Sequence, residues 1–154
     1  MKKIAFAGTD GRTLLWALVT ATATGETQQE HYEGVVIRGT PAMPAFTRLM
    51  KWPVTFVSTA SNSVDDYTTA IIAALDQGQI DYVVPMPEAL LFEGVVDRLA
   101  EAGFGDRVLG LAADGAFVEG DKIKCKQLCQ TAGIPVADRW CEVDAKSYKQ
   151  VLTS

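Results

Sequence analysis

Two short turns combine glycine, proline and charged residues in a way that suits the binding of phosphate or sugar groups. The first runs from Gly8 to Arg12 (GTDGR), between an apolar run and a helical pattern. Glycines allow close approach of the backbone, free N–H groups at a helix start attract anions, and an arginine adds a cation. We expect Gly8, Gly11 and Arg12 to hold a phosphate, and the open alternative is a plain strand-to-helix turn.

The second turn is Pro85 to Glu88 (PMPE), which precedes another helical pattern. Pro87 and Glu88 both suit the first turn of a helix, so helix initiation alone would explain them. If the strands have the order 3-2-1-4-5, however, strands 1 and 4 are neighbours and a crevice opens at their carboxyl ends. The two turns would then face each other and hold the phosphate and hydroxyls of a sugar phosphate.

The elements that must position these turns follow an alternating pattern of strand and helix. Short apolar runs rich in β-branched residues predict buried parallel strands at Lys3–Ala7, Gly34–Ile37, Val54–Val57, Tyr82–Val84 and Val108–Leu111. Helical spacing occurs over Thr13–Thr22, Pro44–Met50, Val64–Leu75 and Glu88–Ala102. Expected helix limits are Ser63 or Asp65, Gly78 and Gly103. The pattern predicts an α/β fold with a Rossmann-like open parallel sheet.

The pattern changes after residue 118. A lysine-rich helix is expected from Glu119 to about Ala132, with Gly133 ending it, followed by a strand at Val136–Cys141 and a helical start at Asp144–Leu152. We therefore expect two parts, residues 1–118 and 119–154.

Composition excludes several classes of protein. The 154 residues are 48% hydrophobic and 21% charged, as in globular proteins. No apolar stretch approaches the roughly 20 residues of a membrane span, and the net charge of -5 disfavours broad nucleic-acid binding. Three cysteines, an odd number, suit reduced thiols in a cytoplasmic protein. Cys125 and Cys129 lie one helical turn apart, but the single histidine, His31, is distant in sequence, so no metal site is expected.

The segment from Asp81 to Asp97 (DYVVPMPEALLFEGVVD) resembles the leading domain of phosphoribosylamine–glycine ligase, an enzyme of purine biosynthesis in the ATP-grasp superfamily. The similarity continues through Gly110, Val118 to Lys122 (VEGDK) and Ala132 to Pro135 (AGIP). The first turn is similar to the family's Gly-Ser-Gly-Gly-Arg. Residues from about 23 to 62 match poorly.

The resemblance implies a preATP-grasp domain over residues 1–118 and the first elements of an ATP-grasp domain over 119–154. It further implies a reaction in which ATP activates the glycine carboxylate as an acyl phosphate, which the amine of 5-phosphoribosylamine attacks. Gly8, Gly11, Arg12, Pro87 and Glu88 would bind the ribose phosphate. Lys122 would reach the ATP phosphates, although a solvated surface lysine has the same sequence pattern. ATP and Mg²⁺ are the implied cofactors of the whole enzyme.

Several positions depart from the family pattern. Thr13 and Leu14 replace a glutamate and a histidine, Met86 replaces a glycine, and Leu90 replaces a proline. The Met86 side chain could fill the substrate crevice. The strand lysine, the glycine-rich lid and the metal-binding carboxylates of the family lie beyond the similarity, so we expect a fragment that needs the missing ATP-grasp domain and is inactive alone.

Two other functions stay open. One is a non-catalytic module that binds a sugar phosphate or nucleotide. The other is an NADP-linked reductase, because Arg38 ends the second predicted strand, where an arginine could meet the 2′-phosphate of NADP.

Overall fold

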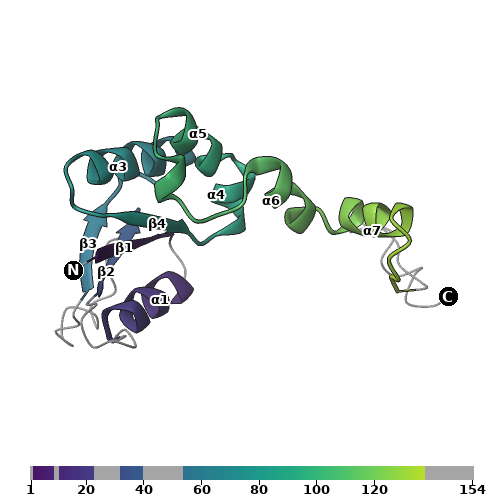
Figure 1. Ribbon diagram of the computed structural model, residues 1–154, viewed down its shortest axis with the longest axis horizontal. Coiled ribbons are helices and arrows are strands. Elements are labelled where there is room, and N and C mark those ends of the chain that lie inside the picture. The colour runs from purple at the N-terminus through teal and green to yellow at the C-terminus, as the bar shows by residue number, and fades with distance from the viewer. Residues whose placement is uncertain (1, 9–10, 23–31, 40–53, 138–154) are drawn as a thin grey trace. The chain divides into compact units, whose positions relative to one another are not determined.

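A computed structural model describes residues 2–8, 11–22, 32–39 and 54–137 (Figure 1). The chain forms two compact units, Met1–Phe117 and Val118–Ser154.

The first unit is built on a parallel sheet of four strands. These are β1 (Lys2–Ala7), β2 (Tyr32–Arg38), β3 (Val54–Ser58) and β4 (Tyr82–Pro85). They lie in the order β3-β2-β1-β4, and each neighbouring pair is parallel. The α/β class and the first four positions of the predicted strand order are confirmed. β1 and β4 are neighbours although most of the unit's sequence separates them.

The prediction of a fifth strand at Val108–Leu111 is wrong for the described structure. Only an isolated parallel bridge joins Val108 to Val83. The Leu109 N–H donates to the Val83 carbonyl oxygen at 2.9 Å. Leu109 and Leu111 are 72% and 49% exposed, so this segment lacks the two covered faces of an internal parallel strand.

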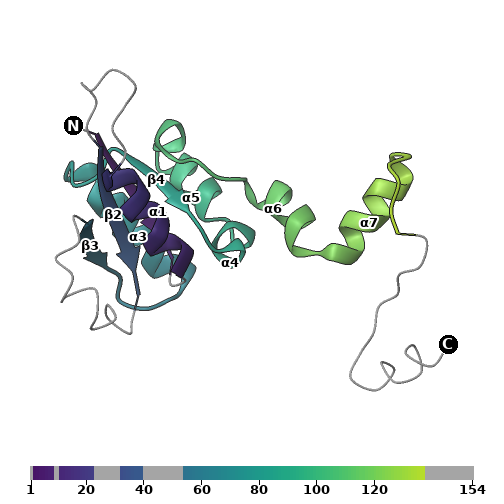
Figure 2. The ribbon, with the colours of Figure 1, turned by 90° about the horizontal axis from the view of Figure 1, so that it is seen from below.

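Helices cover the two faces of the sheet (Figures 1 and 2). α1 (Gly11–Thr22) packs on one face, where Leu14 and Ala17 join Phe6 and Val36 in a small apolar cluster. The other face is covered by α3 (Val64–Asp76), α4 (Glu88–Phe92) and α5 (Val95–Glu101). A larger cluster there combines alternate strand residues, such as Val35 and Ile37, with residues of these three helices. The helices after β1 and β4 therefore leave on opposite faces, as the crevice requires.

α1 lies very close to β2 because Gly34 has no side chain. A Cβ at this position would come within 1.9 Å of the Ala17 carbonyl oxygen, a distance that no real contact allows. This contact sets the position of α1 along the length of β2. The start of α1 consequently lies near the carboxyl ends of β1 and β2.

The helix limits follow local chemistry. The Ser63 hydroxyl accepts the Asp66 N–H, so Ser63 rather than Asp65 is the N-cap of α3. The helix predicted over Glu88–Ala102 is instead two helices, because Gly94 adopts a left-handed conformation (φ 81°) between α4 and α5. Gly78 and Gly103 have positive φ values after α3 and α5, as expected.

Beyond α5, a 3₁₀ turn (Gly105–Arg107) is attached to the start of β4, since the Arg107 guanidinium donates to the carbonyl oxygens of Ile80 and Asp81, both at 2.8 Å. α6 (Ala113–Gly120) follows and was not predicted. Its residue Phe117 stacks on Phe92, with ring centroids 5.6 Å apart.

The described part of the second unit contains α7 (Lys122–Thr131). The predicted helix start at Glu119 is wrong, because the Asp121 side chain accepts the N–H groups of Ile123 and Lys124 and starts the helix there. Gly133 has a positive φ of 70° after α7, as expected. The predicted helices at Pro44–Met50 and Asp144–Leu152, and most of the predicted strand at Val136–Cys141, lie outside the described residues. None of the described helices is long and apolar enough to cross a bilayer.

Candidate functional site

The two predicted turns meet at the carboxyl ends of β1 and β4. Ala7 pairs with Pro85 in the sheet, and the Met86 N–H donates to the Ala7 carbonyl oxygen at 3.0 Å. A Cβ on Gly8 would lie 2.7 Å from both Cγ and Cδ of Pro87. Gly8 also has a φ of 154°, which side-chain-bearing residues rarely adopt. Glycine at position 8 is therefore needed for the contact between the turns.

Charged groups of the two turns also approach each other. Arg12 Nη1 lies 3.5 Å from Glu88 Oε1, and the two side chains are 56% and 51% exposed. An ion pair this exposed contributes about 0–1 kcal/mol to stability. A ligand could displace it at little cost, so the pair suits a binding site better than a structural one.

Gly11 is the first residue of α1, and a Cβ built on it meets no atom within 4 Å. The fold does not need glycine there, in contrast to Gly8. Gly11 and Arg12 are both exposed, so the first turn of α1 is accessible at these two residues, which suits the approach of an anion.

The residues that depart from the family pattern are packed in the core. Thr13 and Leu14 are 1% and 8% exposed, and the Thr13 Oγ1 lies against the first turn, 2.8 Å from the position of a Cβ on Gly8. The Met86 side chain is partly buried against the α1-side cluster. Met86 does not line the pocket described next.

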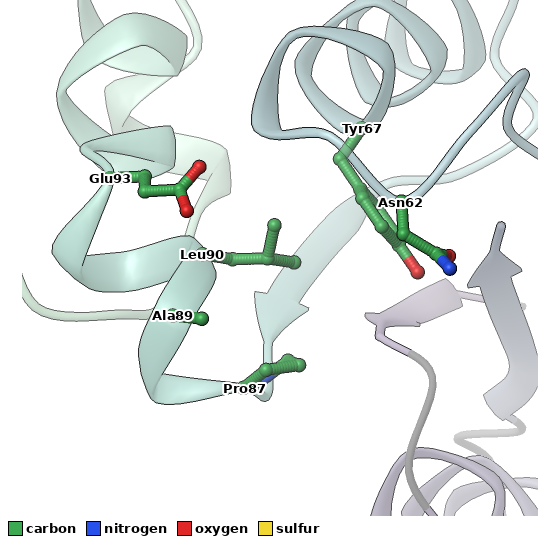
Figure 3. Close-up of a pocket in the computed structure, with 6 residues that line it drawn as sticks. All are labelled: Asn62, Tyr67, Pro87, Ala89, Leu90 and Glu93. Carbon is green, nitrogen blue, oxygen red and sulfur yellow. The ribbon is translucent and has the colours of Figure 1, made fainter.

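A pocket of about 110 Å³ lies beside Pro87, on the side of the sheet covered by α3 and α4 (Figure 3). It is lined by Asn62, Tyr67, Pro87, Ala89, Leu90 and Glu93. Figure 3 shows Leu90 of α4 pointing across the pocket toward Tyr67 and Asn62, which come from α3 and the loop before it. The lining thus combines an apolar wall with an amide, a phenol and a carboxylate, groups that can bind hydroxyls or an amine.

Buried hydrogen bonding fixes the inner wall of this pocket. The Tyr67 hydroxyl accepts the Gly39 N–H at 3.1 Å, and the Tyr67 side chain is 1% exposed. A Cβ on Gly39 would lie 2.0 Å from Asn62 Oδ1, so Asn62 packs directly against the end of β2.

Sequence reasoning did not find Asn62, Tyr67 or Glu93. Tyr67 has the spacing of a core residue on α3. The polar run from Ser61 to Ser63, directly after a strand, was the available signal, because loops at the carboxyl ends of parallel strands line ligand sites.

Arg38 is the last residue of β2 and pairs with Ser58 of β3. Its Nε is buried and has no hydrogen-bond partner among the described residues. The structure thus places Arg38 at the same edge of the sheet as the two turns, at the position that motivated the reductase hypothesis.

The second unit contains Lys122, Cys125 and Cys129. Lys122 is exposed at the first position of α7, whose first-turn N–H groups are partly occupied by the Asp121 cap. Burial raises the pKa of the Cys125 thiol, and the charge of Cys129 and a hydrogen bond with it raise the pKa further. Within the described ranges, no group of three or more His, Cys, Asp or Glu residues could hold a metal ion.

Comparison with curated proteins finds segments of phosphoribosylamine–glycine ligases. The enzyme of Rhodopirellula baltica is 38% identical over 69 residues, which cover 45% of this chain and 15% of the relative. That of Nostoc is 37% identical over 92 residues, covering 60% and 21%. That of Listeria monocytogenes is 41% identical over 61 residues, covering 40% and 14%. No protein-family model matches the sequence.

Solved structures of biotin carboxylases have a similar fold. The biotin carboxylase domain of a single-chain bacterial carboxylase gives a TM-score of 0.54 at 16% identity and covers 99% of this chain and 35% of that one. Biotin carboxylase from Campylobacter jejuni, in a complex with β,γ-ATP, gives 0.52 at 21% identity and covers 88% and 29%. Similarity at this level of identity concerns the fold alone. The sequence matches, by contrast, confirm the resemblance noted above: over the stretch they cover, this chain is similar to phosphoribosylamine–glycine ligases, of whose length the matched stretches span about a fifth or less.

Proposed function

We propose that this chain is part of an ATP-dependent carboxylate–amine ligase similar to phosphoribosylamine–glycine ligase, and that its first unit binds the ribose phosphate of the amine substrate. The observation that carries the proposal is the contact of Gly8 with Pro87. This contact brings together the two turns that resemble the family, at the point where neighbouring strands send their helices to opposite faces of the sheet.

The groups at this point suit a sugar phosphate. The open N–H end of α1 at Gly11 and the Arg12 guanidinium suit the phosphate, and the Glu88 carboxylate suits ribose hydroxyls. The pocket beside Pro87 adds further hydrogen-bonding groups within the same unit. Gly8 and Pro87 hold the two turns in contact rather than touching the substrate through polar side chains.

In the whole enzyme, ATP would phosphorylate the glycine carboxylate. The amine of 5-phosphoribosylamine would then attack this acyl phosphate, forming the C–N bond of glycinamide ribonucleotide and releasing ADP and phosphate. Residues 1–118 would form the preATP-grasp domain, and residues from 119 would begin the ATP-grasp domain. Lys122 would contribute its ammonium group to binding of the ATP phosphates.

Binding of ribose 5-phosphate to the 154-residue chain tests the proposal. Titration followed by amide resonances should shift those of Gly8, Gly11, Arg12 and Glu88. The Gly78 amide, at the carboxyl end of α3, serves as the internal control and should not move. A folded protein in which none of the four amides responds at millimolar ligand would overturn the substrate assignment.

Catalysis is tested separately. The matched relatives are several times longer than the similar segments, so we expect no release of ADP when this chain alone is given ATP, glycine and phosphoribosylamine. Glycinamide ribonucleotide formation by this chain alone would contradict that expectation. In a longer protein that is active, Lys122→Ala should raise the KM for ATP, while Lys126→Ala on the same helix serves as the matched control.

A further inference from the structure

Arg38 carries a buried polar atom that the fold leaves unsatisfied. Its Nε is the one buried side-chain nitrogen or oxygen in the described residues that lacks a hydrogen-bond partner. The Nε–H of an arginine can only donate a hydrogen bond, so it needs an acceptor. Buried donors without acceptors are rare in folded proteins, because the lost hydration is not replaced. An oxyanion bound next to Arg38 would supply the missing acceptor.

The alternation of β2 places this side chain on the face covered by α1. Val36 packs in the α1-side cluster, whereas Ile37 packs in the cluster on the opposite face. Side chains two residues apart on a strand share a face, so Arg38 lies on the same face as Val36. Ser58, its partner in the register, ends β3 beside it.

The position along the strand is level with the start of α1. Gly34 contacts Ala17. From Gly34 to Arg38 the strand advances about 13 Å toward its carboxyl end. Back from Ala17 to Gly11 the helix covers about 9 Å in the same direction, because α1 runs opposite to the strands. Arg38 therefore lies level with, or slightly beyond, the exposed N–H groups of the first helical turn.

The other arginine of this region is already engaged. Arg12 lies 3.5 Å from the Glu88 carboxylate, which offsets its charge. Arg38 differs, because its buried Nε–H has no hydrogen-bond partner among the described residues, and this makes it the better counter-charge for an anion at the start of α1.

We propose that Arg38 binds the phosphate of a phosphomonoester through its Nε–H, beside the first-turn N–H groups of α1. The proposal rests on the proposed function, which places a sugar phosphate at this edge of the sheet. Nε and one Nη of a guanidinium form a planar fork that matches two phosphate oxygens, a geometry that lysine does not offer. Arg38 is thus a substrate-recognition residue that selects phosphorylated over unphosphorylated sugars.

Ligand titrations on the full 154-residue chain test this role. Calorimetry with ribose 5-phosphate should show a loss of affinity of about 10-fold or more in both Arg38→Gln and Arg38→Lys, as expected for loss of a hydrogen bond between charged groups. Arg98→Gln is the charge-matched control, since Arg98 pairs with Asp65 on the opposite face of the sheet, and it should bind like the parent. Unphosphorylated ribose should bind equally to all four proteins.

The possible results separate this inference from the proposed function. If ribose 5-phosphate shifts the Gly8 and Gly11 amides and binds Arg38→Gln as tightly as the parent, the role of Arg38 is overturned and the proposed function stands. If the parent binds no ribose 5-phosphate, the proposed function fails. In that case NADP⁺ is tested next, because its 2′-phosphate is also a phosphomonoester. If the parent binds NADP⁺ and Arg38→Gln does not, the phosphate site at Arg38 is supported with a nucleotide as its ligand. If the parent does not bind NADP⁺ either, the Arg38 proposal is overturned.

A second measurement covers the case in which the variants fail to fold. Phenylglyoxal modifies accessible arginines in the parent protein, and peptide mass spectrometry locates the modified residue. Ribose 5-phosphate should protect Arg38 at least as strongly as Arg12 and should leave Arg98 unprotected. Equal modification of Arg38 with and without saturating ligand would overturn the proposal.

Discussion

Gly8 and Pro87 touch across the carboxyl ends of two neighbouring strands, so closely that a Cβ on Gly8 would lie 2.7 Å from two carbon atoms of the proline ring. The Gly8 N–H also donates to the Ile37 carbonyl oxygen at 2.9 Å, which ties the same residue to β2. The position of the first turn is therefore set by both neighbours of β1. A change at Gly8 disturbs the fold and the candidate site together.

We expect Gly8→Ala to lower the free energy of unfolding by about 1–3 kcal/mol, because the new Cβ meets Pro87 and the backbone conformation is strained for alanine. Urea denaturation measures the change. Gly11→Ala is the matched control: its Cβ meets no atom within 4 Å, so its stability should equal or slightly exceed that of the parent. Equal urea midpoints for the two variants would contradict the described contact.

The hydroxyl of Tyr67 should contribute to stability although it lies beside a candidate ligand pocket. Tyr67→Phe leaves the buried Gly39 N–H without its acceptor, so we expect a loss of about 1–3 kcal/mol in the free energy of unfolding. Tyr82→Phe is the control, because Tyr82 is 40% exposed and its ring, which lies under the Lys2 ammonium, is kept. Thermal unfolding compares them, and a Tyr82→Phe effect as large as that of Tyr67→Phe would refute the role of the buried hydrogen bond.

The sheet could be predicted because its four strands are short β-branched runs separated by helical patterns, a local signal. The run Val108–Leu111 (VLGL) is also short and apolar, but it contains a single β-branched residue and a glycine and is not a strand. Whether such a run forms a strand depends on whether other elements cover its two faces, and here Leu109 and Leu111 are left exposed. The split of the Glu88 helix depends on the conformation of one glycine, Gly94, which a helical pattern tolerates in sequence.

In the candidate site, too, some residues can be identified from their local sequence, whereas others depend on contacts with residues far away in the chain. Gly8, Arg12, Pro87 and Glu88 could be proposed from the sequence because glycine, proline and charge mark turns by their own chemistry. Tyr67 was missed, since its position in the pocket depends on the Gly39 N–H, a partner that lies far away in sequence. The exposed first turn at Gly11 and the unsatisfied Nε of Arg38 likewise become visible only when strand register and helix packing are known.

The thiol of Cys125 should react slowly at neutral pH. Burial and the neighbouring Cys129 raise its pKa above the usual value, so less of the reactive thiolate is present at pH 8 than in an unfolded peptide. We expect the rate of alkylation by iodoacetamide to increase about 10-fold per pH unit from pH 7 to 9, as for any thiol below its pKa. Cys129→Ala removes both the charge and the hydrogen bond of residue 129 and should speed alkylation of Cys125. Peptide mass spectrometry resolves each cysteine, and a slower reaction of Cys125 in Cys129→Ala would contradict the prediction.

The ion pair between Arg12 and Glu88 should matter for binding and little for folding. A double-mutant cycle with Arg12→Gln and Glu88→Gln should give a coupling energy of at most about 1 kcal/mol in urea denaturation, because both side chains are about half exposed. The coupling energy should shrink further in 1 M salt, where charges are screened over about 3 Å.

The affinity for ribose 5-phosphate, unlike stability, should fall in both variants. Glu88→Gln weakens a contact to the ribose, and Arg12→Gln weakens the attraction for the phosphate. The matched control is the pair Arg98 and Asp65, which is exposed on the opposite face and whose substitution should leave ribose 5-phosphate affinity unchanged. If the cycle gave several kcal/mol while ligand affinity stayed constant, the pair would be a structural link between the two turns, and the binding role assigned to Arg12 and Glu88 would be wrong.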